Sequence, residues 1–208
     1  MSEHGPEPSR GNTLTNELST TLEALAHLLG VYHIGTVVAR SRRTDERGVT
    51  EFDFTTNTIH RTWSITNLDT GAAETNHNGL YTHFNRAGET VHEAKSPTAG
   101  LIPPAIRLCY PLDLPSWGRQ RDNFKIARAE STPTGYLIHL AHKQDSTQHG
   151  TLTMNSETGL LTRWITYRDN NSIADYELAS IVRPSHQPVS NDDGTITSIS
   201  FDDNANDG

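Results

Sequence analysis

Short runs of alternating apolar and polar residues follow Gly30, and this period of two restricts the chain to an antiparallel β-sheet. The turns between the runs, such as LDTG at 68–71 and HNG at 77–79, are short and typical of hairpins. About eleven strands are too many for a flat open sheet, so we expect the sheet to curl into an open barrel. The predicted strands are 31–40, 48–56, 58–67, 72–78, 80–85, 89–94, 122–130, 135–143, 150–155, 160–168 and 172–182.

Two other apolar segments can cover one face of this sheet. Residues 13–29 carry leucines at spacings of three and four, which predicts an amphipathic helix that ends at Gly30. Residues 95–120 contain five prolines and the apolar stretch LIPPAIRLCYPLDLPSWG, which predicts a short helix around 103–109. The fold class is therefore mainly β (α+β), and we expect a cavity between the curled sheet and its helical cover.

The 208 residues are most simply one domain, which we place at 13–185. Residues 1–12 and the acidic, Asn-rich residues 186–208 are predicted to be largely disordered tails. Within the second tail, TITSISF at 195–201 alternates and is compatible with an added edge strand.

Charge and cysteine content exclude several classes of function. A net charge of -8 argues against nucleic-acid binding, which requires a basic surface. No basic and apolar leader opens the chain and no apolar run approaches a bilayer span, so we expect a cytoplasmic protein without a transmembrane segment. The single cysteine, Cys109, permits no intrachain disulfide and no multi-thiolate zinc site, and we expect it to be a buried, inert thiol. No metal and no cofactor is predicted.

Three segments, in this order, resemble the LolA-like superfamily of bacterial lipoprotein carriers. They are IHRTW with Arg61 and Trp63; NHNGLYTHFNRAGETVHE with Asn78, Gly79, Leu80, Tyr81 and Phe84; and TLTMNSETGLLTRW with Asn155, Thr158, Gly159, Leu160 and Arg163. A proline that usually precedes the first segment is replaced by Asn57 or a neighbour. The resemblance spans roughly residues 13–182 and implies an open barrel that holds lipid acyl chains beneath covering helices. The family would also imply export, but the chain shows no signal peptide or lipobox cysteine.

The two arginines of these segments share predicted strand faces with apolar residues. Arg61 alternates with Ile59, Trp63 and Ile65, and Arg163 alternates with Leu161, Ile165 and Tyr167. Each arginine either reaches the rim and pairs with a carboxylate such as Asp53 or Glu177, or binds the carboxylate or phosphate of an apolar ligand. Trp117 lies in the irregular segment, where it could close a pocket. The predicted ligand-binding residues are Arg61, Trp63, Trp117, Arg163 and Tyr167.

Histidines are the candidates for catalysis. His60, His83 and His139 fall on predicted strands, where each could act singly as a general base or lie exposed on the sheet. His139 and His142 in HLAH lie on opposite faces of a strand, so they do not predict a zinc site.

These observations leave three classes of function open. The favoured one is a non-enzymatic binding protein for an apolar or amphipathic small molecule, for example an acylated one, held in a mostly dry pocket. The second is a cofactor-independent cyclase or isomerase that uses the same pocket and needs an inward His, Tyr or carboxylate with a perturbed pKa. The third is a protein-interaction module, whose barrel would be packed shut.

Overall fold

The computed structural model describes residues 10–30, 34–95 and 102–182. A long helix, α1 (Arg10–Gly30), is followed by eleven strands and two 3₁₀ helices, η2 (Pro104–Cys109) and η3 (Pro111–Asp113). None of the helices in these ranges has the length and apolar character that a membrane span requires. The strands are β1 (Thr36–Asp45), β2 (Gly48–Asn57), β3 (Thr62–Asn67), β4 (Ala73–His77), β5 (Leu80–Phe84), β6 (Thr90–Lys95), β7 (Phe124–Thr132), β8 (Gly135–His142), β9 (Gln148–Asn155), β10 (Leu161–Arg168) and β11 (Asn171–Val182).

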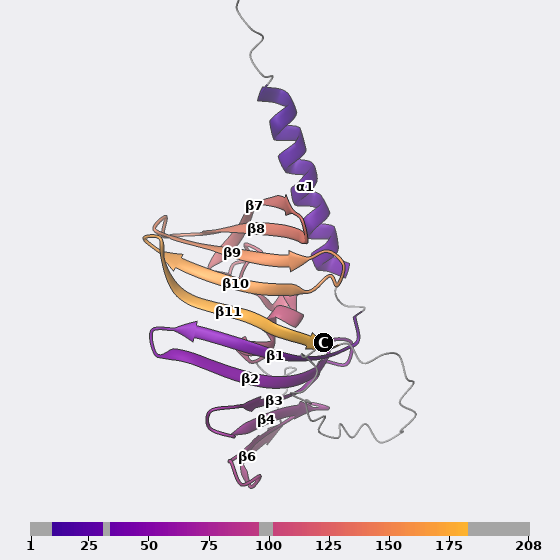
Figure 1. Ribbon diagram of the computed structural model, residues 1–208, viewed down its shortest axis with the longest axis vertical. Coiled ribbons are helices and arrows are strands. Elements are labelled where there is room, and N and C mark those ends of the chain that lie inside the picture. The colour runs from indigo at the N-terminus through magenta and orange to yellow at the C-terminus, as the bar shows by residue number, and fades with distance from the viewer. Residues whose placement is uncertain (1–9, 31–33, 96–101, 183–208) are drawn as a thin grey trace, which may run out of the picture.

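All eleven strands form one antiparallel sheet that does not close on itself (Figure 1). The spatial order is β6-β5-β4-β3-β2-β1-β11-β10-β9-β8-β7, so every strand pair joins neighbours in sequence except β1 with β11, and β6 and β7 form the two edges. The predicted fold class, an unclosed antiparallel sheet with a helical cover, is therefore confirmed. The observed strand bounds fall close to the predicted ones because hairpin turns and alternation are local signals.

One face of the sheet, here called the inner face, packs against η2, which contacts β1, β2, β10 and β11. Its core consists of side chains that alternate along the strands and are at most 7% exposed: Val37, Ala39, Phe54, Trp63, Ile65, Ile138, Leu140, Leu152, Met154, Leu161, Trp164 and Leu178. The outer face instead carries cross-strand ion pairs, including Arg40 with Asp53 and Arg42 with Glu51. This separation of apolar and charged faces is what the alternation predicted.

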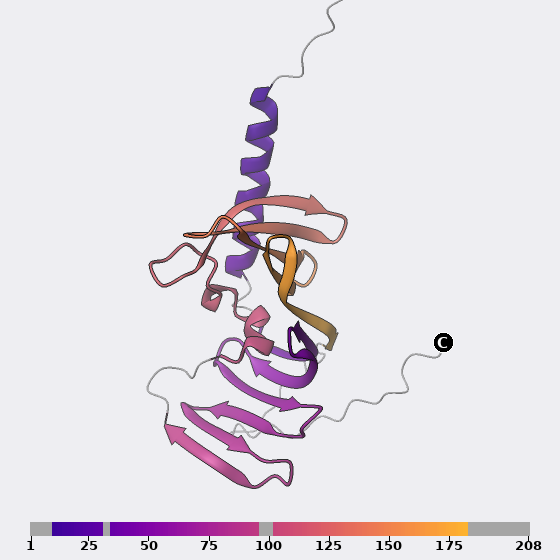
Figure 2. The ribbon, with the colours of Figure 1, turned by 90° about the vertical axis from the view of Figure 1, so that its left-hand side faces the viewer.

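Helix α1 lies across the β7 edge of the sheet, and its N-terminal half extends beyond that edge (Figures 1 and 2). The hydroxyl of Thr21 accepts a hydrogen bond of 3.0 Å from the backbone N–H of Ala129 in β7. Ala24 and Leu28 are buried, but Leu18, Leu22 and Leu29 are 53–62% exposed. The helix was predicted correctly, although only part of its apolar residues faces the sheet.

Strand boundaries differ from the prediction at two places that matter for the site. β1 runs to Asp45 rather than residue 40, because Arg40 and Arg42 point to the outer face and satisfy their charges there. Residues 58–61, predicted as the start of a strand, form a turn in which Arg61 has a φ of 55°.

The helix begins at Arg10, inside the segment predicted as a tail. Residues 1–9, the start of the predicted strand at 31–33 and the whole of 186–208, with TITSISF, lie outside the described residues.

Candidate functional site

Residues 102–114, here called the plug, fill the inner face where the sequence predicted a lid over a cavity. Most of the plug is built from η2 and η3, whose proline-rich sequence cannot continue as a regular helix. Its large side chains point into the sheet and are at most 1% exposed: Ile106, Leu108, Cys109, Tyr110 and Leu114. The predicted cover is therefore present, but it occupies the inner face instead of arching over it.

Polar contacts from Thr56, Asn57 and Arg61 hold the C-terminal part of the plug, and we call them the latch. The Tyr110 hydroxyl contacts the Thr56 hydroxyl and donates to the carbonyl oxygen of Asn57 at 3.3 Å. Arg61 Nη2 donates to Asp113 Oδ2 at 2.8 Å, and its guanidinium carbon lies 5.4 Å from the centre of the Tyr110 ring. Both partners of this ion pair are 31% exposed, so water reaches the latch.

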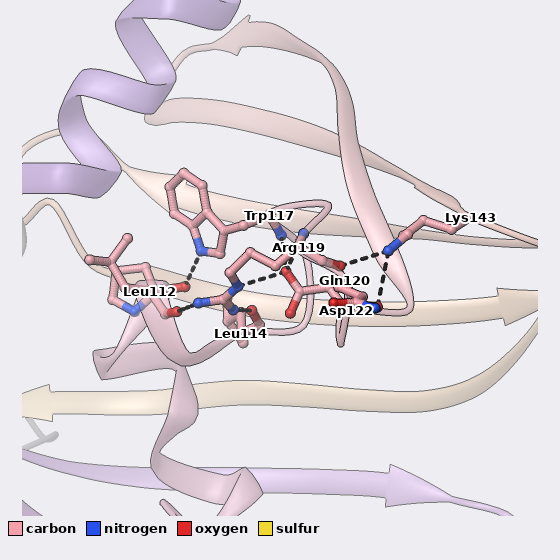
Figure 3. Close-up of polar contacts among 8 residues, drawn as sticks. Leu112, Leu114, Trp117, Arg119, Gln120, Asp122 and Lys143 are labelled. Carbon is pink, nitrogen blue, oxygen red and sulfur yellow. Dashed lines mark hydrogen bonds and ion pairs between the residues drawn. The ribbon is translucent and has the colours of Figure 1, made fainter.

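Arg119 holds the same C-terminal part of the plug from the other direction along the chain, through three hydrogen bonds (Figure 3). Its guanidinium donates to the carbonyl oxygens of Leu112 and Leu114 at 2.8 and 2.7 Å, and to Asp122 Oδ2 at 2.9 Å. The same carboxylate oxygen accepts the backbone N–H groups of Trp117 and Arg119 at 3.1 Å. These contacts fix the chain that leaves the plug and leads into β7.

Two further contacts reinforce this anchor. Trp117 Nε1 donates to the carbonyl oxygen of Pro111 at 2.7 Å, and Lys143 Nζ donates to the carbonyl oxygen of Arg119 at 2.6 Å (Figure 3). Trp117 thus ties the plug to the start of β7 and packs against the core. Sequence reasoning missed Arg119 and Asp122, although SWGRQRDN contains a tight turn whose arginine and aspartate are three residues apart.

Tyr110 gives the plug a specific alkaline sensitivity. Burial raises the pKa of Tyr110 to about 12, although its contact with Thr56 acts in the opposite direction. An unfolded tyrosine has a pKa of about 10, so above pH 10 the unfolded state loses the proton while the folded state keeps it, and stability falls by about 2 to 3 kcal/mol as the pH approaches 12. Tyr110→Phe should cost about 1 kcal/mol at pH 8, for the lost hydrogen bonds, and should be less alkali-sensitive than the parent protein.

Urea unfolding at pH 8, 10 and 11 measures this difference. Because the pKa values of Tyr81 and Tyr136 are also raised, chiefly by burial, only the difference between the parent protein and Tyr110→Phe isolates the plug. Equal losses of stability in both proteins between pH 8 and 11 would show that the Tyr110 hydroxyl does not remain protonated in the folded state.

Arg163 points to the outer face, and the question raised by its apolar neighbours has a structural answer. Its Nε and Nη2 donate to the two carboxylate oxygens of Asp175 at 3.0 and 2.6 Å. The register skips Thr162, so a bulge turns Leu161 inward with Trp164 while Arg163 stays outside. Of the two arrangements expected for Arg163, the structure shows the ion pair with a carboxylate, although the partner is Asp175 and neither Asp53 nor Glu177.

The remaining predicted ligand residues do not converge. Arg61 pairs with Asp113 in the latch, while Ile59, predicted to share its face, is 58% exposed. Trp63 is 2% exposed in the core, with its ring 6.2 Å from that of Tyr81. Tyr167 stacks on His149 at 4.9 Å, and both belong to the outer-face half of the β9–β10 pairing. Of the five predicted ligand-binding residues, Arg61, Trp63 and Trp117 lie on the inner side of the sheet, and Arg163 and Tyr167 lie on the outer side.

The three candidate histidines are also apart. His60 is exposed in the turn before β3, and His139 lies on the outer face, 3.2 Å from Glu130 Oε1. His83 is on the inner face of β5, where its Nδ1 lies 3.8 Å from Oε1 of Glu74.

The described residues contain no group of three or more His, Cys, Asp and Glu side chains that could hold a metal ion. Burial raises the pKa of the Cys109 thiol to about 12, so it is inert at neutral pH.

Three buried donors on the inner face have no hydrogen-bond partner among the described residues, and we call them the donor cluster. They are the hydroxyl of Ser41, Nε of Arg43 and Nε1 of Trp164. Ser41 and Arg43 lie two residues apart on β1, and Arg43 is paired with Tyr176 of β11, which is paired with Trp164 of β10. No sequence signal marked them, because the pattern shows which face a side chain takes and not whether its polar atom finds a partner.

Two open hollows flank these features. One has a volume of about 390 Å³ and lies between the end of α1 and the β9–β10 turn, lined by Ala26, His27, Gly30, Ile34, Ser156, Glu157, Thr158 and Gly159. The other has a volume of about 290 Å³ and lies at the end of the sheet beyond the donor cluster, lined by Thr44, Asp45, Glu46, Ser172 and Ile173. Neither is the enclosed pocket beneath a lid that the sequence predicted.

No protein-family model and no curated protein matches the chain. Among solved structures, an uncharacterized conserved protein from Thermus thermophilus is 9% identical with a TM-score of 0.50, over 80% of this chain and 88% of that one. MucB in the Pseudomonas aeruginosa MucA/MucB complex is 11% identical with a TM-score of 0.47, over 80% of this chain but only 59% of its own length.

A Vibrio parahaemolyticus domain provisionally named as an outer membrane lipoprotein-sorting protein is 6% identical with a TM-score of 0.34, over 81% of this chain and 92% of that one. At these identities the likeness is one of fold. The match to the Thermus thermophilus protein supports the fold alone, an unclosed antiparallel sheet with a helical cover, and the function of this chain has to be argued from its own residues.

Proposed function

We propose that the protein binds an apolar or amphipathic small molecule, such as an acylated one, on the inner face of its open barrel, and that the plug moves aside to admit it. The observation that carries this proposal is the nature of the cover. An irregular, proline-flanked segment, and not a regular helix, supplies the side chains that keep the inner face dry. The Arg119 anchor and the water-exposed latch both hold residues 110–114 of this segment, and the latch is the contact whose loss would loosen it.

The energetics of such an exchange are close to balanced. Burial of apolar surface contributes about 0.8 kcal/mol per CH₂ group, whether the group belongs to a plug side chain or to an acyl chain. Displacing Leu108 and Ile106 therefore loses burial free energy that a long alkyl chain, buried in their place, can offset. An exposed ion pair such as Arg61 with Asp113 adds only about 0 to 1 kcal/mol to the closed state. The latch can thus open without global unfolding.

Native mass spectrometry of the protein purified from its own source tests the proposal. We expect a hydrophobic molecule to co-purify and to be released by organic solvent. The plug fills the inner face in the structure, so ligand must displace it to bind. A purified protein that carries no ligand and also takes up no fluorescent alkyl probe would contradict the proposal.

Opening the latch gives a second, quantitative readout. Asp113→Ala removes the carboxylate that pairs with Arg61, so we expect it to accelerate uptake of a fluorescent alkyl probe about 2- to 5-fold, in line with a loss of up to about 1 kcal/mol. Asp175→Ala makes the same chemical change on the outer face, where it frees Arg163, and should leave uptake unchanged. Equal effects of the two variants would contradict a role for the plug.

One observation favours the enzymatic alternative as a second candidate. Glu74, Tyr81 and His83 lie on the inner face of β4 and β5, and the pKa of Tyr81 is raised, first by burial and then by Glu74. A cyclase or isomerase would convert the bound molecule, so its co-purified ligand should change mass or isomer ratio on incubation, and His83→Gln should stop that change. A ligand that stays unaltered leaves binding as the function.

A further inference from the structure

We infer that the donor cluster receives the uncharged hydrogen-bond acceptor of the bound molecule, an ester or amide carbonyl oxygen. This inference rests on the proposed function, because it names the polar chemistry of the same ligand. It concerns the part of the inner face formed by β10, β11 and β1, where the described residues present donors without acceptors.

The register brings the three donors onto one small patch. Trp164 is paired with Tyr176, and Tyr176 with Arg43, so these side chains form one row across three adjacent strands. Neighbouring strands lie about 4.8 Å apart, which puts the ends of the row about 10 Å from each other. Ser41 is two residues from Arg43 on the same strand and therefore projects from the same face.

Burial makes the lack of partners costly. Ser41 is 2% exposed and Trp164 is 7% exposed, and the three donor atoms are shielded from solvent. A buried donor without an acceptor costs about 1 to 3 kcal/mol, and natural proteins contain few of them. An acceptor that enters the patch would recover this cost, and this gives the patch an intrinsic affinity for a carbonyl oxygen.

The charges at the patch favour an uncharged acceptor. Arg43 already has a carboxylate partner, because its Nη2 donates to Asp45 on the same face. The backbone N–H of Arg47 is the first of the contacts that hold the pKa of Asp45 below its usual value, so this carboxylate stays ionised at neutral pH. A ligand carboxylate would therefore meet a second negative charge, while an ester or amide oxygen would not.

The surroundings suit the rest of such a molecule. Trp164 and Tyr176 stack with ring centres 5.5 Å apart, and they give the patch an aromatic wall beside the donors. The hollow of about 290 Å³ is lined by Asp45, the partner of Arg43, and so opens toward the same end of the sheet. The carbonyl would sit at the donor cluster, and its alkyl chain would run along the inner face in the space that the plug fills in the structure.

The test compares three ligands of equal chain length: a methyl hexadecanoate, a hexadecanoate and hexadecane. Displacement of a fluorescent alkyl probe from the full chain gives their relative affinities. We expect the ester to bind about 10-fold tighter than the alkane and tighter than the carboxylate. Ser41→Ala and Trp164→Phe each remove one donor with little change of shape, so each should weaken ester binding about 3- to 10-fold and leave alkane binding unchanged.

A matched variant and separate outcomes complete the experiment. Ser64→Ala repeats the serine substitution on the outer face, and it should not change the preference for the ester. If none of the three ligands displaces the probe, the proposed function fails. If all bind equally and the donor variants have no effect, the donors hold only water and the inference fails while the function stands. Tighter binding of the carboxylate would overturn the charge argument.

Discussion

Trp63→Ala is expected to lower the free energy of unfolding by about 3 to 5 kcal/mol, the range for removing a large aromatic side chain from a core. Trp63 is 2% exposed, packs within the inner-face core and lies beside Tyr81. Its removal leaves a cavity in the inner-face core beside Tyr81, which the paired strands cannot close without changing register. Urea unfolding followed by circular dichroism measures the loss, and the midpoint should fall without a large change in slope.

Ile59→Ala is the matched control, because the alternation in the sequence placed Ile59 and Trp63 on the same face. The structure instead leaves Ile59 58% exposed in the turn before β3. The control should therefore change stability by no more than about 0.5 kcal/mol. A loss of similar size in both variants would mean that residues 58–61 continue β3 as a strand, as the sequence pattern predicted.

Arg119→Met is expected to cost about 2 to 4 kcal/mol at pH 7. The variant leaves two plug carbonyl groups without donors and an Asp122 carboxylate that is 2% exposed without its counter-charge. The lower end of this range allows for the 36% exposure of the Arg119 side chain itself. Arg121→Met, two residues along and exposed, should be nearly neutral. Differential scanning calorimetry of the three proteins provides the comparison.

The pH dependence of this effect follows from Asp122. Burial pushes the pKa of Asp122 up, but the hydrogen bonds from Arg119 and from backbone N–H groups outweigh it, and the net pKa is lowered. A lowered carboxylate pKa stabilises the fold above the unfolded value of about 3.9, and this contribution is lost as the pH falls through the folded pKa. The gap in stability between the parent protein and Arg119→Met should therefore narrow below about pH 4. A constant gap from pH 7 to pH 3 would show that Asp122 does not titrate with the anchor.

Much of the fold could be predicted from the sequence because its information is local. Alternation and short turns determine each hairpin, and eleven strands follow from them without reference to distant contacts. The errors occur where one residue changes the face of its neighbours. The bulge at Thr162 separates Leu161 from Arg163, and the turn at Arg61 removes Ile59 from the core. A period of two carries no signal for either event.

The candidate site was less predictable, for two physical reasons. Whether the cover arches over the inner face or fills it depends on side-chain volumes summed over the plug and the strand positions that face it, which a pattern does not contain. Whether a donor is satisfied depends on the positions of acceptors on other strands. Arg43 and Trp164 could each be assigned a face from their strands, but their shared lack of partners emerges only from the register of β1, β11 and β10.

The pairing of β1 with β11 has a consequence for the order of folding. Every other strand pair joins neighbours in sequence, so β1–β6 and β7–β11 can each assemble by closing short loops. The seam between β1 and β11 joins residues from opposite ends of the described chain, such as Val38 and Val182, and must wait for the largest loop to close. The plug rests on both sides of this seam, on β1 and β2 as well as β10 and β11. The step that unites the two arms therefore also creates the surface on which the plug and the donor cluster depend.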